Sequence, residues 1–144
     1  MVIYPDTSFL FSLYGQDAHS EQARKIGGAL KAPFIFTPLH RHELRNAFRL
    51  TLFRKAITPD QCRAVLAAIE DDIKTGALME TPVAWAEVFH TAEALSAGHT
   101  ETLGTRATDI LHVAAASALG AKDFFTFDAR QKALAHKAGM NVTP

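Results

Sequence analysis

Short, wholly apolar runs alternate with longer amphipathic stretches along this chain. Each run is too short for a helix and ends at a polar or turn-forming residue, which is typical of a strand buried on both faces. We predict such strands at 2–4, 34–36 and 124–127, and shorter ones at 78–79 and 140–142.

Helical periodicity fills the segments between these runs. Thr58 followed by Pro59 and Gln61 has the pattern of an N-cap, a first-turn proline and a capping box. Thr81-Pro82 repeats the start of this pattern, so we expect a helix from there to about Gly98 and a polar loop over 99–105. The helices are predicted at about 9–14, 20–30, 39–55, 59–74, 82–98, 106–119 and 129–138.

Buried strands that alternate with helices indicate a parallel sheet covered on both faces. We therefore predict an α/β fold, a three-layer α/β/α sandwich with a central, mostly parallel sheet. The 144 residues match the usual size of one compact domain, so a single domain over 1–144 is expected. Sheets of this kind bind their ligands at the carboxyl ends of the strands.

Composition excludes several classes of protein. Net charge is zero, with 15 basic and 15 acidic side chains, which argues against binding nucleic acid through global charge but allows a local basic patch. The single cysteine, Cys62, rules out an intrachain disulfide and zinc sites built on several thiolates, and its helical spacing with Val65 and Ile69 predicts a core position. No apolar run reaches about 18 residues and no secretory leader is seen, so a cytoplasmic protein is expected.

Four acidic residues are predicted to meet at the carboxyl edge of the sheet. Asp6 and Asp128 each follow a predicted strand, and Glu43 lies in the first turns of the helix after the second strand. Asp109 lies in the first turn of the alanine-rich helix that leads into the third main strand, and that helix must start at the same edge if the sheet is parallel.

Clustered carboxylates repel one another unless a cation neutralises them. Mg²⁺ and Mn²⁺ prefer such oxygen ligands and can activate a water toward a phosphodiester. The alternatives stay open at this point: Asp6 and Asp128 as turn formers or helix caps, Glu43 as a surface partner of an arginine, and Asp109 as a partner of Arg106.

Three segments together resemble the PIN-domain family. They are the opening Asp6-Thr7-Ser8-Phe9-Leu10, the central His42-Glu43-Leu44 with Asn46-Ala47, and the stretch from Thr105 to Ala116 followed by Phe124-Phe125-Thr126-Phe127-Asp128. Each motif is short, but their order and spacing cover nearly the whole chain.

This resemblance implies a metal-dependent ribonuclease, with stand-alone members of this length being mostly VapC-type toxins of toxin–antitoxin pairs. It implies a homodimer that is silenced by a small antitoxin protein. Asp6 and Asp109 would be the main ligands of one or two Mg²⁺ or Mn²⁺ ions, with Glu43 completing the site and Asp128 serving a second ion or orienting a water.

The resemblance also assigns supporting positions. Ser8 would hydrogen-bond Asp6, and Thr126 would line the site. Many toxin members carry a further acid a few residues beyond the fourth, whereas this chain continues Ala129-Arg130-Gln131-Lys132, which puts the second metal ion in doubt.

His112 lies three residues after Asp109 and shares its helix face. It is either a ligand or phosphate contact, or a packed residue that donates a hydrogen bond. The helix that carries Glu43 begins like a zinc-protease motif, but Asn46 stands where the second histidine is required. Ser8 lacks the glycine-flanked elbow of a serine hydrolase, so that reading is rejected as well.

Arginines recur every fourth residue on the Glu43 helix, at Arg41, Arg45 and Arg49. They form either a phosphate track for RNA or an ordinary solvated face. The acidic run 70–72 is expected to be a solvent face. Phe48, Leu52 and Phe53 exceed one core-facing stripe, which indicates either a partner face or full burial.

Two functions follow from these observations. The first is a Mg²⁺- or Mn²⁺-dependent endoribonuclease, the toxin of a toxin–antitoxin pair. The second is a non-catalytic module on the same fold, which uses its acidic groove to hold basic side chains of a protein partner. Retention of all four acids favours the first.

Overall fold

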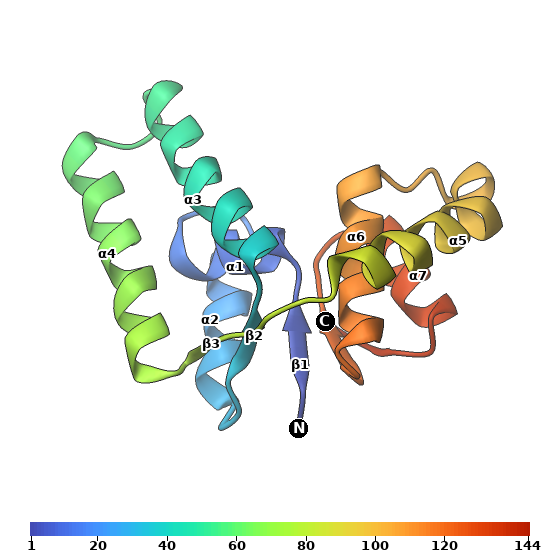
Figure 1. Ribbon diagram of the computed structural model, residues 1–144. Helices are drawn as coiled ribbons and strands as arrows, with labels where there is room; N and C mark the ends of the chain where they lie inside the picture. Colours follow the sequence, from blue (N-terminus) through green and yellow to red (C-terminus); the bar gives the residue numbers. More distant parts are fainter. The chain divides into compact units, whose positions relative to one another are not determined.

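The computed structural model describes residues 1–144 and divides into two compact units (Figure 1). Unit 1 comprises Met1–Asp6 and Pro82–Pro144, and unit 2 comprises Thr7–Thr81. The single domain predicted over 1–144 stays a prediction. None of the helices combines the length and apolar character needed to cross a membrane.

Unit 1 contains three parallel strands, with β4 between β1 and β5. Tyr4 of β1 lies opposite Phe124 of β4, which lies opposite Val142 of β5. The elements of this unit are β1 (Ile3–Pro5), α5 (Trp85–Leu103), α6 (Ala107–Ala118), β4 (Asp123–Phe125), α7 (Ala129–Lys137) and β5 (Asn141–Thr143).

The core of unit 1 forms because its strands are apolar on both faces and α6 is rich in alanine. Tyr4 and Phe124 are fully buried and their rings stack with centroids 5.6 Å apart. Ala114, Ala115 and Ala116 of α6 are also fully buried, since methyl side chains allow neighbouring backbones to approach closely. α6 packs against α5 on one side and α7 on another.

Unit 2 contains two parallel strands, with Phe34 of β2 opposite Leu78 of β3. Helices α3 and α4 form an antiparallel hairpin (Figure 1). The elements of this unit are α1 (Thr7–Tyr14), α2 (Ser20–Ala29), β2 (Phe34–Phe36), α3 (Pro38–Phe53), α4 (Pro59–Thr75) and β3 (Leu78–Glu80).

Helix caps set the boundaries of this hairpin. Thr37 caps α3 and Thr58 caps α4, each within a complete capping box and each followed by a first-turn proline. α4 ends at Gly76, whose φ of 84° is favourable only for glycine. The cap predicted at Thr58 is therefore confirmed. The predicted α/β class is confirmed as well, since every strand pair is parallel.

The predicted start and end of the longest helix were wrong. Thr81 caps nothing: its Oγ1 donates to the Met79 carbonyl, and α5 begins at Trp85. α5 also continues through Gly98 to Leu103, because half-buried side chains at Leu95, His99 and Leu103 extend its inner face. The polar loop expected over 99–105 is helical until Gly104, whose φ of 66° ends the helix.

The acidic run 70–72 is not a plain solvent face, contrary to expectation. Glu70 accepts hydrogen bonds from Arg41 and Arg45 of α3, and Asp72 accepts one from the Tyr14 hydroxyl. Only Asp71 is exposed. Glu70 thus links α4 to α3, and Asp72 links α4 to α1. Cys62 is buried in this packing, as predicted.

Candidate active site

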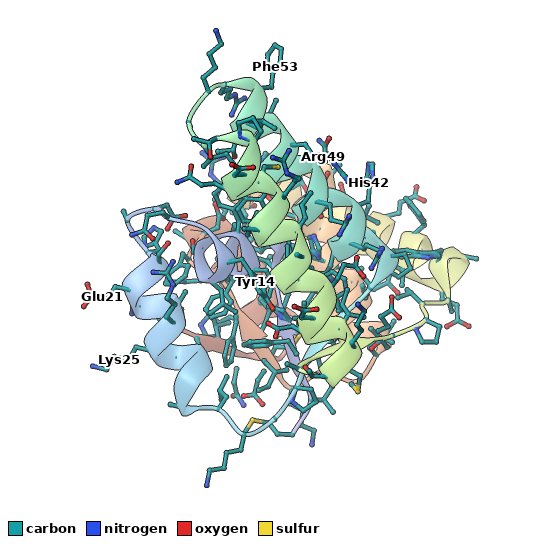
Figure 2. All side chains as sticks on the ribbon, turned by 90° about the vertical axis from the view of Figure 1, so that its left-hand side faces the viewer. Tyr14, Glu21, Lys25, His42, Arg49 and Phe53 are labelled. Carbon is teal, nitrogen blue, oxygen red and sulfur yellow. The ribbon has the colours of Figure 1, made fainter.

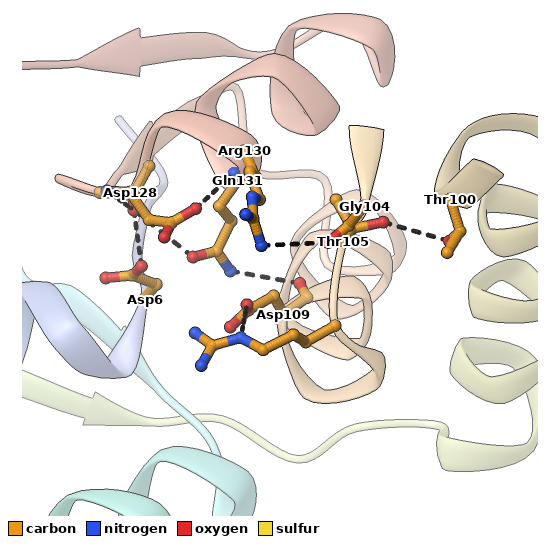
Figure 3. A network of polar contacts seen from close by, with 10 residues as sticks. Asp6, Thr100, Gly104, Thr105, Asp109, Asp128, Arg130 and Gln131 are labelled. Atoms are coloured by element: carbon orange, nitrogen blue, oxygen red, sulfur yellow. Dashed lines mark hydrogen bonds and ion pairs between the residues drawn. The ribbon is translucent and has the colours of Figure 1, made fainter. Parts of the chain in front are cut away.

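Asp6 is a nearly buried carboxylate at the carboxyl end of β1. The β1–β4 ladder continues past the strand, since the Asp6 amide donates to the Phe125 carbonyl at 2.9 Å. The Asp6 side chain is 2% exposed, and the Thr126 hydroxyl donates to its Oδ2 at 2.6 Å (Figure 3). A bond this short is typical of a charge-assisted hydrogen bond to an ionised carboxylate.

Thr126 also connects Asp6 to Asp128. The Asp128 amide donates to Thr126 Oγ1 at 3.0 Å, so the hydroxyl accepts one bond and gives its single proton to Asp6. Gln131 Oε1 lies 3.4 Å from the same oxygen, a weaker contact because that proton is already donated. The hydroxyl therefore has a fixed orientation toward Asp6.

Asp128 is the N-cap of α7. Its Oδ1 accepts from the Gln131 amide at 2.8 Å, so the helix-cap alternative is correct for this residue. Gln131, 1% exposed, donates from Nε2 to the Asp109 carbonyl at 3.2 Å (Figure 3). The start of α7 is thereby attached to the first turn of α6.

Asp109 lies in that first turn, with its side chain 22% exposed. Its Oδ2 accepts from Arg106 Nε at 3.0 Å, the pairing that the sequence left open as an alternative. Arg106 is 75% exposed, so the pair is screened by water and contributes little stability. Asp6, Asp109 and Asp128 are thus gathered in unit 1 by bonds that run through Thr126 and Gln131.

Glu43 belongs to unit 2, where it lies on α3. Thr7 Oγ1 donates to Glu43 Oε1 at 3.0 Å. Thr7 is the residue that follows Asp6 in the chain. The adjacent residues Asp6 and Thr7 therefore belong to different units. Asp6 is an acid of unit 1, and Thr7 holds the Glu43 carboxylate of unit 2.

Sequence reasoning missed two of these residues. Gln131 stands three positions after an N-cap acid, the spacing of a capping box, and that signal identifies it in retrospect. Thr7 carried no signal of its own, because its role depends on Glu43, which is 36 positions away.

His112 is a packed residue. It is 1% exposed, and its Nδ1 lies 2.8 Å from the Tyr4 hydroxyl within the core of unit 1. This corresponds to the second of the two readings of His112. Ser8 is exposed, and its support of Asp6 stays a prediction, while Thr126 makes the hydrogen bond to Asp6 described above.

The acids fit a hard divalent cation by donor chemistry. The donors are carboxylate oxygens without sulfur, and Oδ1 of Asp109 and Oδ2 of Asp128 make no hydrogen bond of their own. Neither unit brings together three histidine, cysteine or acidic side chains with metal-binding spacing. Mg²⁺ suits such a sparse set, since it keeps several waters and binds through one or two carboxylates.

The three arginines expected to form a stripe on α3 differ in their partners. Arg41 and Arg45 both bind Glu70, at 2.5 and 2.8 Å, and Arg41 also lies 3.8 Å from Glu80. Arg49 is exposed and makes no ion pair. Two of the three arginines predicted to contact RNA are therefore engaged with acids of their own unit.

Comparisons with known proteins agree with this architecture. The model of the PIN domain matches residues 3–137. No curated protein matches the chain. The structure is similar to that of the Mycobacterium tuberculosis toxin VapC20, described as cleaving the sarcin-ricin loop, with 20% identity, a TM-score of 0.68, and 91% of this chain and 93% of that chain covered.

Two further solved structures are similar to this chain. VapBC2 from Rickettsia felis, bound to a DNA fragment from its promoter, has 15% identity and a TM-score of 0.64, with 99% of this chain and 98% of that chain covered. FitAcB from Neisseria gonorrhoeae has 14% identity and a TM-score of 0.68, with 99% and 97% covered. At these identities the likeness concerns the fold.

Proposed function

The chain belongs to the PIN-domain family, and from this premise we propose that it is a metal-dependent endoribonuclease that hydrolyses RNA phosphodiester bonds. The observation that carries the proposal is the buried carboxylate of Asp6, fixed by the Thr126 hydroxyl and linked to Asp109 and Asp128. Burial of a carboxylate is costly unless it is hydrogen-bonded or paired, so an acid held in such a position at the end of a parallel strand is a candidate functional group.

Each side chain has a separate task in this proposal. Asp6 and Asp109 would hold Mg²⁺ or Mn²⁺, with Asp128 and Glu43 as further ligands or water-orienting groups. Such an ion, when bound, supplies Lewis-acid stabilisation and a water of lowered pKa. Glu43 is included because Thr7, adjacent to Asp6 in the chain, donates to its Oε1.

Hydrogen bonds from the protein pre-organise these acids. The Thr126 hydroxyl donates to the Asp6 carboxylate and restricts its rotation. The Gln131 side chain fixes the Asp109 backbone, so the first turn of α6 presents its carboxylate without rearrangement. Fixed geometry of this kind is what in-line attack on a phosphodiester requires.

We propose that the cell uses this activity as a toxin. The similarity to VapC20, VapBC2 and FitAcB supports this role and a small antitoxin protein as partner. We further propose a homodimer as the assembly and the cytoplasm as the compartment. Co-expression of the protein with the product of a neighbouring small open reading frame tests it: growth arrest by the protein alone, relieved by co-expression, is the expected result.

Cleavage of end-labelled RNA in Mn²⁺ or Mg²⁺ tests the nuclease activity. We expect Asp6→Asn and Asp109→Asn to abolish cleavage, and Glu43→Gln and Asp128→Asn to reduce it strongly. Asp71→Asn is the matched control, because Asp71 is an exposed acid elsewhere in the chain.

Full cleavage in excess EDTA, or by Asp6→Asn, contradicts the nuclease proposal. If the asparagine variants bind a protein partner as the wild type does and Mn²⁺ binds too weakly for calorimetry to detect, the chain is instead the non-catalytic binding module.

A further inference from the structure

The carboxyl-terminal end of α3 is an exposed surface that combines an aromatic ring with cations. Phe53 is 81% exposed and Leu50 is 39% exposed, although both belong to a helix whose other face is buried through Leu44 and Phe48. We call this surface the α3 tip; it consists of Arg49, Leu50, Phe53, Arg54 and Lys55. Figure 2 shows Phe53 at the upper end of α3, with Arg49 below it on the same helix.

The cations of the α3 tip differ from the other arginines of the helix. Arg41 and Arg45 are neutralised by Glu70, whereas Arg49, Arg54 and Lys55 are exposed and form no ion pair. The acid at the start of α4 does not compensate them, because Asp60 pairs with Arg63. The tip therefore carries uncompensated positive charge in a chain whose net charge is zero.

Helix stability explains only part of this pattern. Cations near a helix C-terminus interact favourably with its dipole, but the effect falls off within the last turn, so it applies to Arg54 and Lys55 and not to Arg49. It offers no reason for an exposed phenylalanine.

Lys55 is also unfavourable for the backbone. Its φ is 59°, at the position after the helix where glycine is strongly preferred, and its amide donates to the Leu52 carbonyl at 2.9 Å. The lysine charge is thus present at a position where glycine fits the backbone better.

We propose that the α3 tip binds single-stranded RNA, with its cations on phosphates and the Phe53 ring stacked on a base. The inference rests on the proposed nuclease function, for which it names a substrate contact outside the acidic site. Unpaired cations beside an exposed aromatic ring are the features by which proteins bind single strands without reading their sequence.

An exposed helix face connects the tip with the Glu43 segment. His42, Asn46, Arg49 and Phe53 follow one another at helical spacing, and all four are exposed. At 1.5 Å per residue, this face extends about 16 Å from His42, next to Glu43 in the chain, to Phe53. Figure 2 shows His42, Arg49 and Phe53 in this order along α3.

Fluorescence anisotropy with a labelled single-stranded RNA, measured in EDTA, separates binding from cleavage. We expect Phe53→Ala to weaken binding by about tenfold, since removing a stacking aromatic costs on the order of one decade or more in affinity. Phe53→Tyr keeps the ring and should bind as the wild type does, while Phe53→Leu keeps apolar surface and should not. Phe89→Ala is the control, because Phe89 is an exposed phenylalanine of unit 1.

The salt dependence of binding reports the cations. For single strands, the slope of log K against log salt changes by about 0.7 for each phosphate contact. The double variant Arg49→Gln/Arg54→Gln should therefore reduce the slope by about 1.4. Lys74→Gln, which removes an exposed charge of α4, should leave it unchanged.

Wild-type affinity in Phe53→Ala and in the double variant overturns the proposal, as does the absence of any RNA binding by the wild type. Equal binding of an RNA strand and an abasic strand overturns the stacking contact. If Phe53→Ala changes only the molecular mass in light scattering, the tip is a protein interface and the proposal is wrong. Binding that depends on the tip in a wild type that cleaves nothing supports this inference while the nuclease proposal fails.

Discussion

The Thr126 hydroxyl has one proton, and it goes to Asp6. The Asp128 amide donates to the same oxygen, and the other acceptor within reach, Gln131 Oε1, lies at 3.4 Å against 2.6 Å for Asp6 Oδ2. The residue is fully buried, so water cannot replace the bond if the hydroxyl is removed. In the proposed nuclease, the position of the Asp6 carboxylate would therefore depend on a side chain that needs no contact with RNA.

Thr126→Val tests this dependence at nearly constant volume. We expect unfolding free energy to fall by about 1.5–3 kcal/mol, the usual contribution of a hydrogen bond to a charged group, and cleavage to fall with it. Thr126→Ser keeps the hydroxyl and should retain most activity despite the lost methyl group. Urea unfolding and a cleavage assay measure both quantities; equal activity in the valine and serine variants would contradict the role.

At the scale of elements, a half-buried tyrosine joins α1 to α4. The Tyr14 hydroxyl donates to Asp72, and burial, followed by the hydrogen bond and charge of Asp72, raises the pKa of Tyr14 above its ordinary value. The folded chain therefore holds this proton more tightly than the unfolded chain does. The resulting stability is fully present below about pH 10 and is lost as pH rises above it.

Tyr14→Phe should remove this contribution. We expect a loss of about 1–2 kcal/mol at pH 7, since Asp72 loses its partner, and a smaller difference between variant and wild type above pH 10. Thermal unfolding monitored by circular dichroism at both pH values measures the difference. A difference that stays constant with pH would show that Tyr14 acts through packing alone.

The end of α3 allows a second test at this scale. Lys55→Gly should stabilise the protein by about 0.5–1 kcal/mol, because glycine adopts the left-handed conformation without steric cost. The same variant should bind RNA more weakly. Lys74→Gln, which removes a charge from the exposed face of α4, serves as the control for both measurements.

Elements were predictable from the sequence where local chemistry decides them. Thr58 uses its own side chain to cap α4, so its pattern was sufficient. Thr81 has the same pattern, but its hydroxyl bonds to Met79 and α5 starts later. Gly98 failed as a helix end because it lies on the exposed face of α5, where it interrupts no packing.

The candidate site was predictable for a topological reason. A parallel ladder places Asp6 and Thr126 at one edge, and α6 must begin at that edge. The bonds from Thr7 to Glu43 in unit 2 and from Gln131 to Asp109 in unit 1 were not predictable, because they join residues distant in the chain and depend on rotamers that no local pattern specifies.

At the scale of the whole molecule, a bound cation should increase stability. Mn²⁺ at 100 times its dissociation constant stabilises a folded protein by about 2.7 kcal/mol, provided that the unfolded chain does not bind it. We expect the melting temperature of the wild type to rise by several degrees in Mn²⁺ and to return in EDTA. Asp6→Asn and Asp109→Asn should show no such rise, and Asp71→Asn should behave as the wild type does.

The capping bond of Asp128 means that this acid has two reasons to persist. Substitution of Asp128 would remove about 1 kcal/mol of helix stability, even in a homologue without nuclease activity. The Asp109 side chain has no such second role, since its one partner is an arginine largely surrounded by water. In a survey of natural variants of this chain, an intact Asp128 would therefore be poor evidence that the proposed nuclease activity is present. A change at position 109 should be the earlier sign that this activity has been lost.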